Sequence, residues 1–220
     1  MTTSMFIPSS QVSVVGSTTA TTPPAWVSGA GTGSGNTTII PDVTGAINRD
    51  LVLAGLPSRT TNPVTASPTG WTEGSPSPGN LRNFIRTIDN DIATDHTWTY
   101  QTSGITRDGV ALTVRRGEIT SQSSLINTVS IPDFTSPGPG SMLVVMAQQS
   151  SENNETLASG TLNRLERKLT KGSASYQTAQ ETTLFVEENL PAGTISGRQI
   201  DPDGGSPTSY RLLVSVIKPI

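Results

Sequence analysis

Short apolar runs separated by glycine and proline recur along this chain. Asp50–Ala54, Val110–Val114 and Met142–Ala147 are clear examples. Runs of this length bounded by turn residues are typical of β-strands, whereas an amphipathic helix needs a longer stretch. The pattern predicts roughly ten strands and an all-β fold, a two-sheet, jelly-roll-like β-sandwich. The other expected strands are Thr37–Ile40, Leu81–Ile88, His96–Tyr100, Leu162–Leu169, Thr182–Val186, Thr194–Arg198 and Tyr210–Lys218.

The chain also contains an internal repeat. The segment from Pro41 to Ala54 resembles the one from Pro132 to Val145, which begins 91 positions later (132 − 41). A second pair, Gly109–Arg115 and Ser209–Ser215, lies 100 positions apart (209 − 109). We therefore expect a sandwich built from two similar halves, one of them about nine residues longer than the other (100 − 91).

One expected strand also fits a helix. Leu162, Leu165 and Leu169 lie three and seven positions apart, which places them on one face of a helix. The repeat, however, places this segment opposite Trp71, which lies 91 positions before Leu162 (162 − 71). On that ground we favour a strand here and leave the helix as the alternative.

Residues 1–22 differ in composition from the rest of the chain. No charged residue occurs up to Gly35, and Gln11–Val15 alternates polar and apolar positions as a strand does. This segment is either a disordered leader or an extended N-terminal arm that becomes ordered by adding a strand to a neighbouring subunit. We expect the β-sandwich domain to span 23–220, with half-repeats at about 37–119 and 128–220.

The charge content narrows the classes of partner. Charged residues make up 14% of the chain, against about 25% in a typical globular domain, and the net charge is −3. No basic stripe occurs, which disfavours nucleic acid because phosphate binding needs clustered cations. The absence of cysteine suits assembly in a reducing cytoplasm. No apolar run reaches the roughly 20 residues that cross a membrane and no secretory signal pattern occurs, so we expect no membrane association.

No catalytic or cofactor motif is recognisable. His96 is the only histidine, and no Gly-x-Ser-x-Gly elbow accompanies it. Gly29–Gly35 follows no hydrophobic strand and opens no helix, so we interpret it as a flexible loop. Asp89–Asp95 departs from a calcium-binding EF-hand loop, with Thr94 in place of its glycine, and Asp201–Gly205 has the chemistry of a turn. We expect no enzyme, no catalytic residue, no cofactor and no metal site.

The aromatic residues could either build the core or form a platform on which sugar rings stack. In a protein with 5% aromatic residues, the core is their more common place. We expect Trp71, which follows a Pro-Thr-Gly turn, to close one end of the sandwich. The six candidates are Trp26, Trp71, Trp98, Tyr100, Tyr176 and Tyr210.

Several short elements follow one another in a recognisable order between residues 23 and 220. They are Pro24–Gly29, Pro41–Val43, Asn48–Leu53, Pro68–Thr72 with its Gly-Trp-Thr element, Val110–Gly117 and Tyr210–Pro219. Together these elements resemble the small β-sandwich structural proteins of tailed-bacteriophage virions. The resemblance implies a virion component, assembled in the host cytoplasm, in a capsid decoration, neck, or tail and fibre position. It carries over no catalytic residues.

We therefore expect a non-enzymatic bacteriophage virion protein that forms symmetric contacts with copies of itself and docks onto other virion proteins. The low charge suits this function, because the cores of permanent interfaces are depleted in charge. The alternative is a lectin-like adhesin that binds host surface glycans through loops at one end of the sandwich. A hydrolase of cell-wall polysaccharide fits least well, because no motif supports two converging carboxylates.

Overall fold

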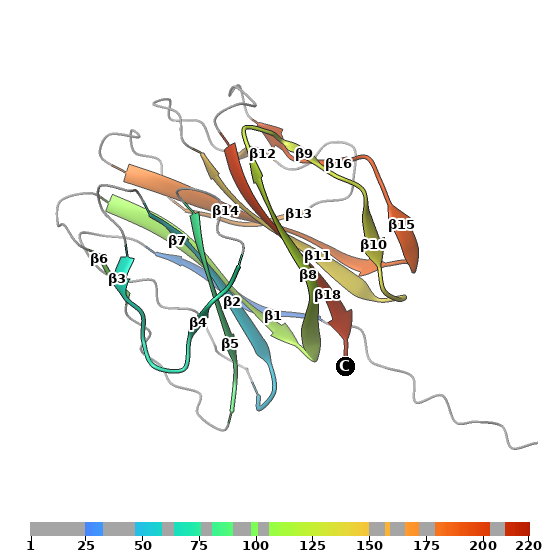
Figure 1. The fold of residues 1–220 in the computed structure, drawn as a ribbon, viewed down its shortest axis with the longest axis horizontal. Helices are drawn as coiled ribbons and strands as arrows, with labels where there is room; N and C mark the ends of the chain where they lie inside the picture. The colour runs from blue at the N-terminus through green and yellow to red at the C-terminus, as the bar shows by residue number, and fades with distance from the viewer. Residues whose placement is uncertain are drawn as a thin grey trace, which may run out of the picture.

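A computed structural model describes residues 25–32, 47–58, 64–75, 81–89, 98–100, 106–149, 157–158, 166–171, 179–202 and 210–220. All regular structure in these ranges is β-strand, so the protein is all-β, as predicted (Figure 1). The described strands form one ten-stranded sheet and four two-stranded sheets. Nearly all pairing is antiparallel, and the exception is the contact between β7 and β14.

The ten-stranded sheet consists of two groups of five strands. The N-terminal group has the order β4 (Thr72–Glu73), β5 (Leu81–Thr87), β2 (Leu51–Pro57), β7 (Thr106–Arg115) and β1 (Ala25–Thr32). The C-terminal group has the order β13 (Glu166–Lys171), β14 (Ala179–Leu190), β11 (Ser141–Gln149), β18 (Tyr210–Pro219) and β8 (Gly117–Ile126).

The strand order of the first group is repeated in the second. The central strand of each group pairs on one side with the group's fourth strand along the chain: β2 pairs with β5, and β11 pairs with β14. On its other side it pairs with the group's last strand: β2 pairs with β7, and β11 pairs with β18. The earliest strand, β1 or β8, pairs with that last strand from outside. The repeated segments in the sequence, β2 with β11 and β7 with β18, therefore occupy corresponding places.

Short strand pairs cover the outer faces of the two groups. Their pairings are β3 (Val64–Ala66) with β6 (Thr99–Tyr100), β9 (Ser130–Ile131) with β16 (Arg198–Gln199), β10 (Phe134–Ser136) with β15 (Gly193–Ile195), and β12 (Leu157–Ala158) with β17 (Asp201–Pro202). Side chains from β3, β9 and β10 and from residues beside the short strands pack on the outward-facing residues of the sheet.

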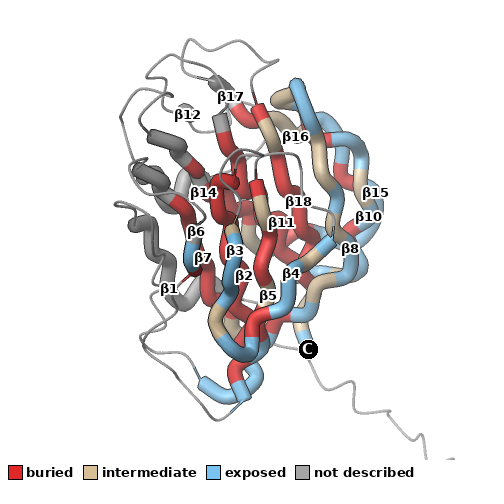
Figure 2. The backbone as a smooth tube through the Cα atoms, turned by 60° about the vertical axis from the view of Figure 1, so that its left-hand side comes forward, coloured by how far each residue is buried: buried red, intermediate tan, exposed pale blue. Residues whose placement is uncertain are grey.

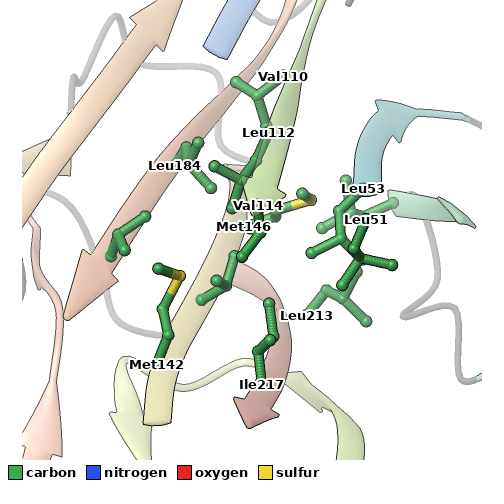
Figure 3. Packing of buried hydrophobic residues seen from close by; sticks show 13 residues of the cluster. Leu51, Leu53, Val110, Leu112, Val114, Met142, Met146, Leu184, Leu213 and Ile217 are labelled. Carbon is green, nitrogen blue, oxygen red and sulfur yellow. The ribbon is translucent and has the colours of Figure 1, made fainter. Parts of the chain in front are cut away.

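The hydrophobic core has three layers because both faces of the central strands are covered. The middle layer joins the two groups: Leu53 and Leu112 from one pack with Met146 and Leu213 from the other (Figure 3). An outer layer lies on each group, and for this reason every residue of β2 is buried. Figure 2 shows the buried central strands, in red, flanked by the paler, more exposed β8.

The two groups contact one another along one side through the main chain. Residues 106–108 of β7 and residues 179–181 of β14 pair in parallel. The opposite side is bridged by side chains instead, as described below. Packing between the inward faces of two strand groups is the arrangement expected of a two-sheet sandwich.

Most expected strands are present, several short strands such as β3, β4 and β17 are additional, and three other differences stand out. Gly29–Thr32 lies in β1, paired with β7, so the interpretation of this run as a flexible loop is wrong. Main-chain pairing needs no side chains, and a glycine-rich segment can therefore occupy an edge once a partner strand is offered. Thr194–Arg198 is interrupted at Ser196–Gly197, where Gly197 has φ of +66° and separates β15 from β16.

The third difference is β8, a ten-residue strand where none was predicted. Most of β8 lies between the two expected half-repeats, at about 37–119 and 128–220. By contrast, the ambiguous segment 162–169 is strand over its described part, since β13 begins at Glu166. Thr37–Ile40 and residues 1–22 lie outside the described residues, as do His96 and Thr97 of the strand expected at 96–100.

Candidate functional site

The polar residues that the sequence offered for chemistry are not brought together in the described ranges. His96, Asp91, Thr94, Asp95 and Asp203 lie outside them. Asp89 is exposed just after β5, and Asp201 belongs to β17. Over the described residues, no three His, Cys, Asp or Glu side chains gather where they could hold a metal ion. The same residues include no helix long and apolar enough to cross a membrane.

The described aromatic side chains are core residues. Trp98 is fully buried and Trp71 is 8% exposed, and their rings meet edge to face with centroids 4.9 Å apart. Phe84 packs against Trp98 at 5.6 Å. Trp71 thus belongs to the outer core layer of the N-terminal group. Tyr210 is fully buried in the outer layer of the C-terminal group.

The side chains of the other three aromatic candidates are not described. Tyr176 lies outside the described residues, and for Trp26 and Tyr100 only the backbone is described, in β1 and β6. The aromatic side chains that are described therefore form no exposed platform for sugar rings.

A hollow of about 330 Å³ lies beside the turn that precedes β2. Its lining includes Arg49 and Arg116, together with the half-exposed Ile47 and Ile220. The buried carboxylate of Asp50 accepts a hydrogen bond from the backbone N–H of Ile47 at 2.9 Å. This hydrogen bond shows that Asp50 stabilises the turn.

The edge strand β8 is the most distinctive exposed feature of the described fold. Within the described ranges it pairs with β18 alone. The N–H of Asn127 donates to the carbonyl of Tyr210 at 2.8 Å, so this pair is a hydrogen-bonded one. Hydrogen-bonded and non-hydrogen-bonded pairs alternate along an antiparallel ladder. The backbone polar groups of the even-numbered residues in Gln122–Ile126 therefore point away from β18.

A groove of about 350 Å³ runs along the outward face of β8. One wall consists of Ser121, Ser123 and Leu125, and the other consists of the segment 131–135. Two valines of β18 that pair with Ser121 and Ser123 form the floor. The groove stays open because the serine side chains are too small to reach the opposite wall. Leu125 and Phe134 are half-buried within it.

The inward face of β8 is polar near the same residues. The Nδ2 group of Asn83, on β5, donates to Oε1 of Gln122 at 3.1 Å. Gln122 Nε2 donates in turn to the hydroxyl of Ser215, on β18, at 2.8 Å. This chain of hydrogen bonds links the two strand groups on the side opposite the β7–β14 pair. The Oδ1 atom of Asn83 is buried, and no described residue donates a hydrogen bond to it.

These features define a surface that can accept an extended peptide. Among the described residues the outer edge of β8 has no partner strand, its outward face carries a groove of mixed polar and apolar lining, and its inward face carries hydrogen-bonding side chains. Strand addition at a sheet edge uses main-chain hydrogen bonds for affinity and pockets for alternate side chains for specificity. We call residues 121–126 with the groove the β8 surface.

Sequence reasoning missed this surface because its signal is weak. Five consecutive polar residues cannot show hydrophobic alternation, and Thr120–Ser124 contains no apolar residue at all. The available signal was the gap between the two strongly apolar strands β7 and β11, which lie on either side of the repeat boundary. Comparison with protein-family models, with curated proteins and with solved structures finds no match to this chain.

Proposed function

We propose that this protein is a non-enzymatic structural component of a bacteriophage virion, a homo-oligomer that assembles through contacts between copies and docks onto other virion proteins. The observation that carries the proposal is the β8 surface. From Ile119 to Ile126 the edge has no charged residue and no proline. Soluble monomers commonly protect a sheet edge with such residues, and an edge without them favours pairing with another chain.

Two further observations support the same function. Only 14% of the residues are charged, which suits surfaces that are permanently covered. The succession of short sequence elements between residues 23 and 220 resembles that of virion structural proteins.

The proposal includes a finer description of the fold. The repeated strand order favours a β-sandwich built from two similar halves, preceded by the N-terminal arm of residues 1–22. Each five-strand group is contiguous in the chain. This contiguity favours a duplicated sandwich over the interleaved Greek keys of a jelly roll.

The lectin-like alternative receives less support. Stacking of sugar rings requires exposed aromatic faces, but Trp71, Trp98 and Tyr210 are buried in outer core layers. A host surface glycan as a partner would therefore depend on residues outside the described side chains. We do not expect turnover of host envelope material.

The first experiment compares the solution mass of the full-length chain with that of a variant lacking residues 1–22, by light scattering. We expect an oligomer that falls to a monomer on deletion, with an unchanged midpoint of thermal unfolding. The deleted variant should also fail to enter purified virions, as measured by mass spectrometry of the particles. If the deleted chain enters particles as well as the full-length chain does, the arm has no part in assembly.

A further inference from the structure

We propose that the β8 surface is the acceptor for residues 11–15 of a second copy of this chain, which add to it as an edge strand. This inference rests on the proposed function, since it identifies the contact through which the copies associate. It names both partners of the contact, whereas the proposed function requires only that copies associate through the arm.

The position of β1 places the donor segment near an acceptor. Ala25, the first residue of β1, pairs with Arg115 at the end of β7, and β8 begins two residues later at Gly117. The 24 residues that precede Ala25 in the sequence therefore enter the fold beside the start of β8. An extended chain spans at most about 3.6 Å per residue, so the segment between residues 15 and 25 reaches across roughly 35 Å. That length is enough to reach a neighbouring copy.

The pattern of Gln11–Val15 matches the two faces of the acceptor. Side chains alternate between the faces of a sheet, so Val12 and Val14 would share one face and Ser13 the other. The outward face of β8 carries the groove, whose apolar lining residues suit the two valines. The inward face carries the partly buried amide of Gln122, a polar group that suits a hydroxyl.

Charge supports the same occupant. The acceptor residues 119–126 and the donor residues 1–22 are both uncharged. Pairing these two segments desolvates no charged side chain of either strand, and Asp133 on the far wall of the groove is the one charged residue in its described lining. A second copy is favoured over the copy's own arm because mutual exchange gives two equivalent contacts and closes the assembly.

The test uses the absence of cysteine in the natural chain. Full-length Ser13→Cys and Ser124→Cys chains are mixed and treated with a short bismaleimide. Any product that joins residue 13 to residue 124 must then join two copies. As the matched control, Ser124→Cys is replaced by Ser196→Cys, an exposed position between β15 and β16. We expect the yield of mixed dimer to be at least fivefold higher for residue 124 than for residue 196.

A second measurement fills the groove. Ser123→Phe in the full-length chain should weaken self-association at least tenfold by light scattering, and Ser196→Phe should leave it unchanged. Far-ultraviolet circular dichroism checks that each variant is folded. The cysteine variants do not depend on that check, because serine and cysteine differ little in size.

The outcomes separate this inference from the proposed function. Equal crosslinking at residues 124 and 196, or normal assembly of a folded Ser123→Phe chain, would overturn β8 as the acceptor. If deletion of residues 1–22 still abolishes assembly in that case, the structural function stands and the arm binds elsewhere. A chain that stays monomeric with or without residues 1–22 would overturn self-association itself.

Discussion

The two strand groups share one strand order, but they differ at the residues that begin their central strands. Arg49 precedes β2 with φ of +74°, and Gly140 precedes β11 with φ of +80°. The two positions lie 91 residues apart (140 − 49), the offset of the internal repeat. Each donates its backbone N–H to the matching strand, Arg49 to Ile88 at 2.8 Å and Gly140 to Leu190 at 3.0 Å. The same left-handed turn therefore holds an arginine in one group and a glycine in the other.

The residue after each of these positions closes the turn in its own way. The N–H of Asp50 donates to the carbonyl of Ile47 at 3.1 Å, and the N–H of Ser141 donates to that of Gly138 at 3.3 Å. The Asp50 carboxylate also accepts from the N–H of Ile47, whereas the Ser141 hydroxyl donates to the carbonyl of Gly138. Backbone geometry has thus been kept in both groups while the side-chain chemistry has diverged.

The outer core layers differ more strongly. Two tryptophans and a phenylalanine dominate the layer on the N-terminal group. The layer on the C-terminal group is mostly aliphatic and includes Phe185 and Tyr210. Equivalent sheet faces have therefore been covered by unrelated loops, so the repeat specifies the strands and leaves their coverings free to vary.

The largest expected effect breaks the tryptophan layer. Trp98→Ala should lower the free energy of unfolding by about 3–5 kcal/mol, because it empties a fully buried site that is packed by Trp71 and Phe84. Denaturant titration measures the loss. Trp98→Phe is the control and should cost less, since the ring nitrogen of Trp98 has no hydrogen-bond partner among the described residues. A cost below about 1 kcal/mol for the alanine variant would place Trp98 outside the core.

The next prediction compares one ion pair from each group. Arg198 binds both carboxylate oxygens of Glu187 at 2.8 Å, and Glu187 is 4% exposed. Arg198→Leu should cost about 3–5 kcal/mol, because it leaves a buried carboxylate without its partner. Arg82 pairs with Glu73 in the N-terminal group, but both are about one-third exposed, so Arg82→Leu should cost no more than about 1 kcal/mol.

A double variant serves as the control for the buried pair. Replacing Arg198 and Glu187 together with leucine should recover most of the stability, because no charge is then left buried. Chemical denaturation of all four proteins gives the comparison. Equal losses for Arg198→Leu and Arg82→Leu would contradict the difference in burial between the two pairs.

The smallest effects test the shared turn directly. Gly140→Ala should lower stability by about 1–2 kcal/mol, because a side chain is unfavourable in the left-handed region. Arg49→Gly should raise stability by about 0.5–1 kcal/mol, as relief of that strain exceeds the added entropy of glycine. Arg49→Ala keeps the strain and should show no such rise. Thermal unfolding measures all three, and a loss of stability in Arg49→Gly would mean that the guanidinium group contributes more than the strain costs.

Some elements could be predicted because their residues must be buried wherever they lie. Leu51–Leu56 and Met142–Ala147 are apolar runs bounded by turn residues, and both are buried central strands. Trp71 belongs to the core, as its size and scarcity suggested. The offset of 91 residues between related segments likewise gave the correspondence of β2 with β11 before any strand order was known.

Other elements could not be predicted because their conformation depends on a partner strand. Gly29–Thr32 has no strand propensity of its own and lies in β1 only because β7 pairs with it. Thr120–Ser124 has no hydrophobic pattern and lies in β8 because β18 pairs with it. The groove beside Ser123 also has no sequence signal, since its opposite wall comes from residues 131–135.

The sequence alone therefore determined the all-β class, the repeat and the strands of the core, because burial of apolar side chains follows from local pattern. Only the tertiary structure decided which strands lie at the edges and which polar residues, such as Gln122 and Asn83, meet between the two groups. The reason is physical: edge pairing uses backbone hydrogen bonds that every sequence can form, so the choice among possible edges is made by the packing of the core beneath them.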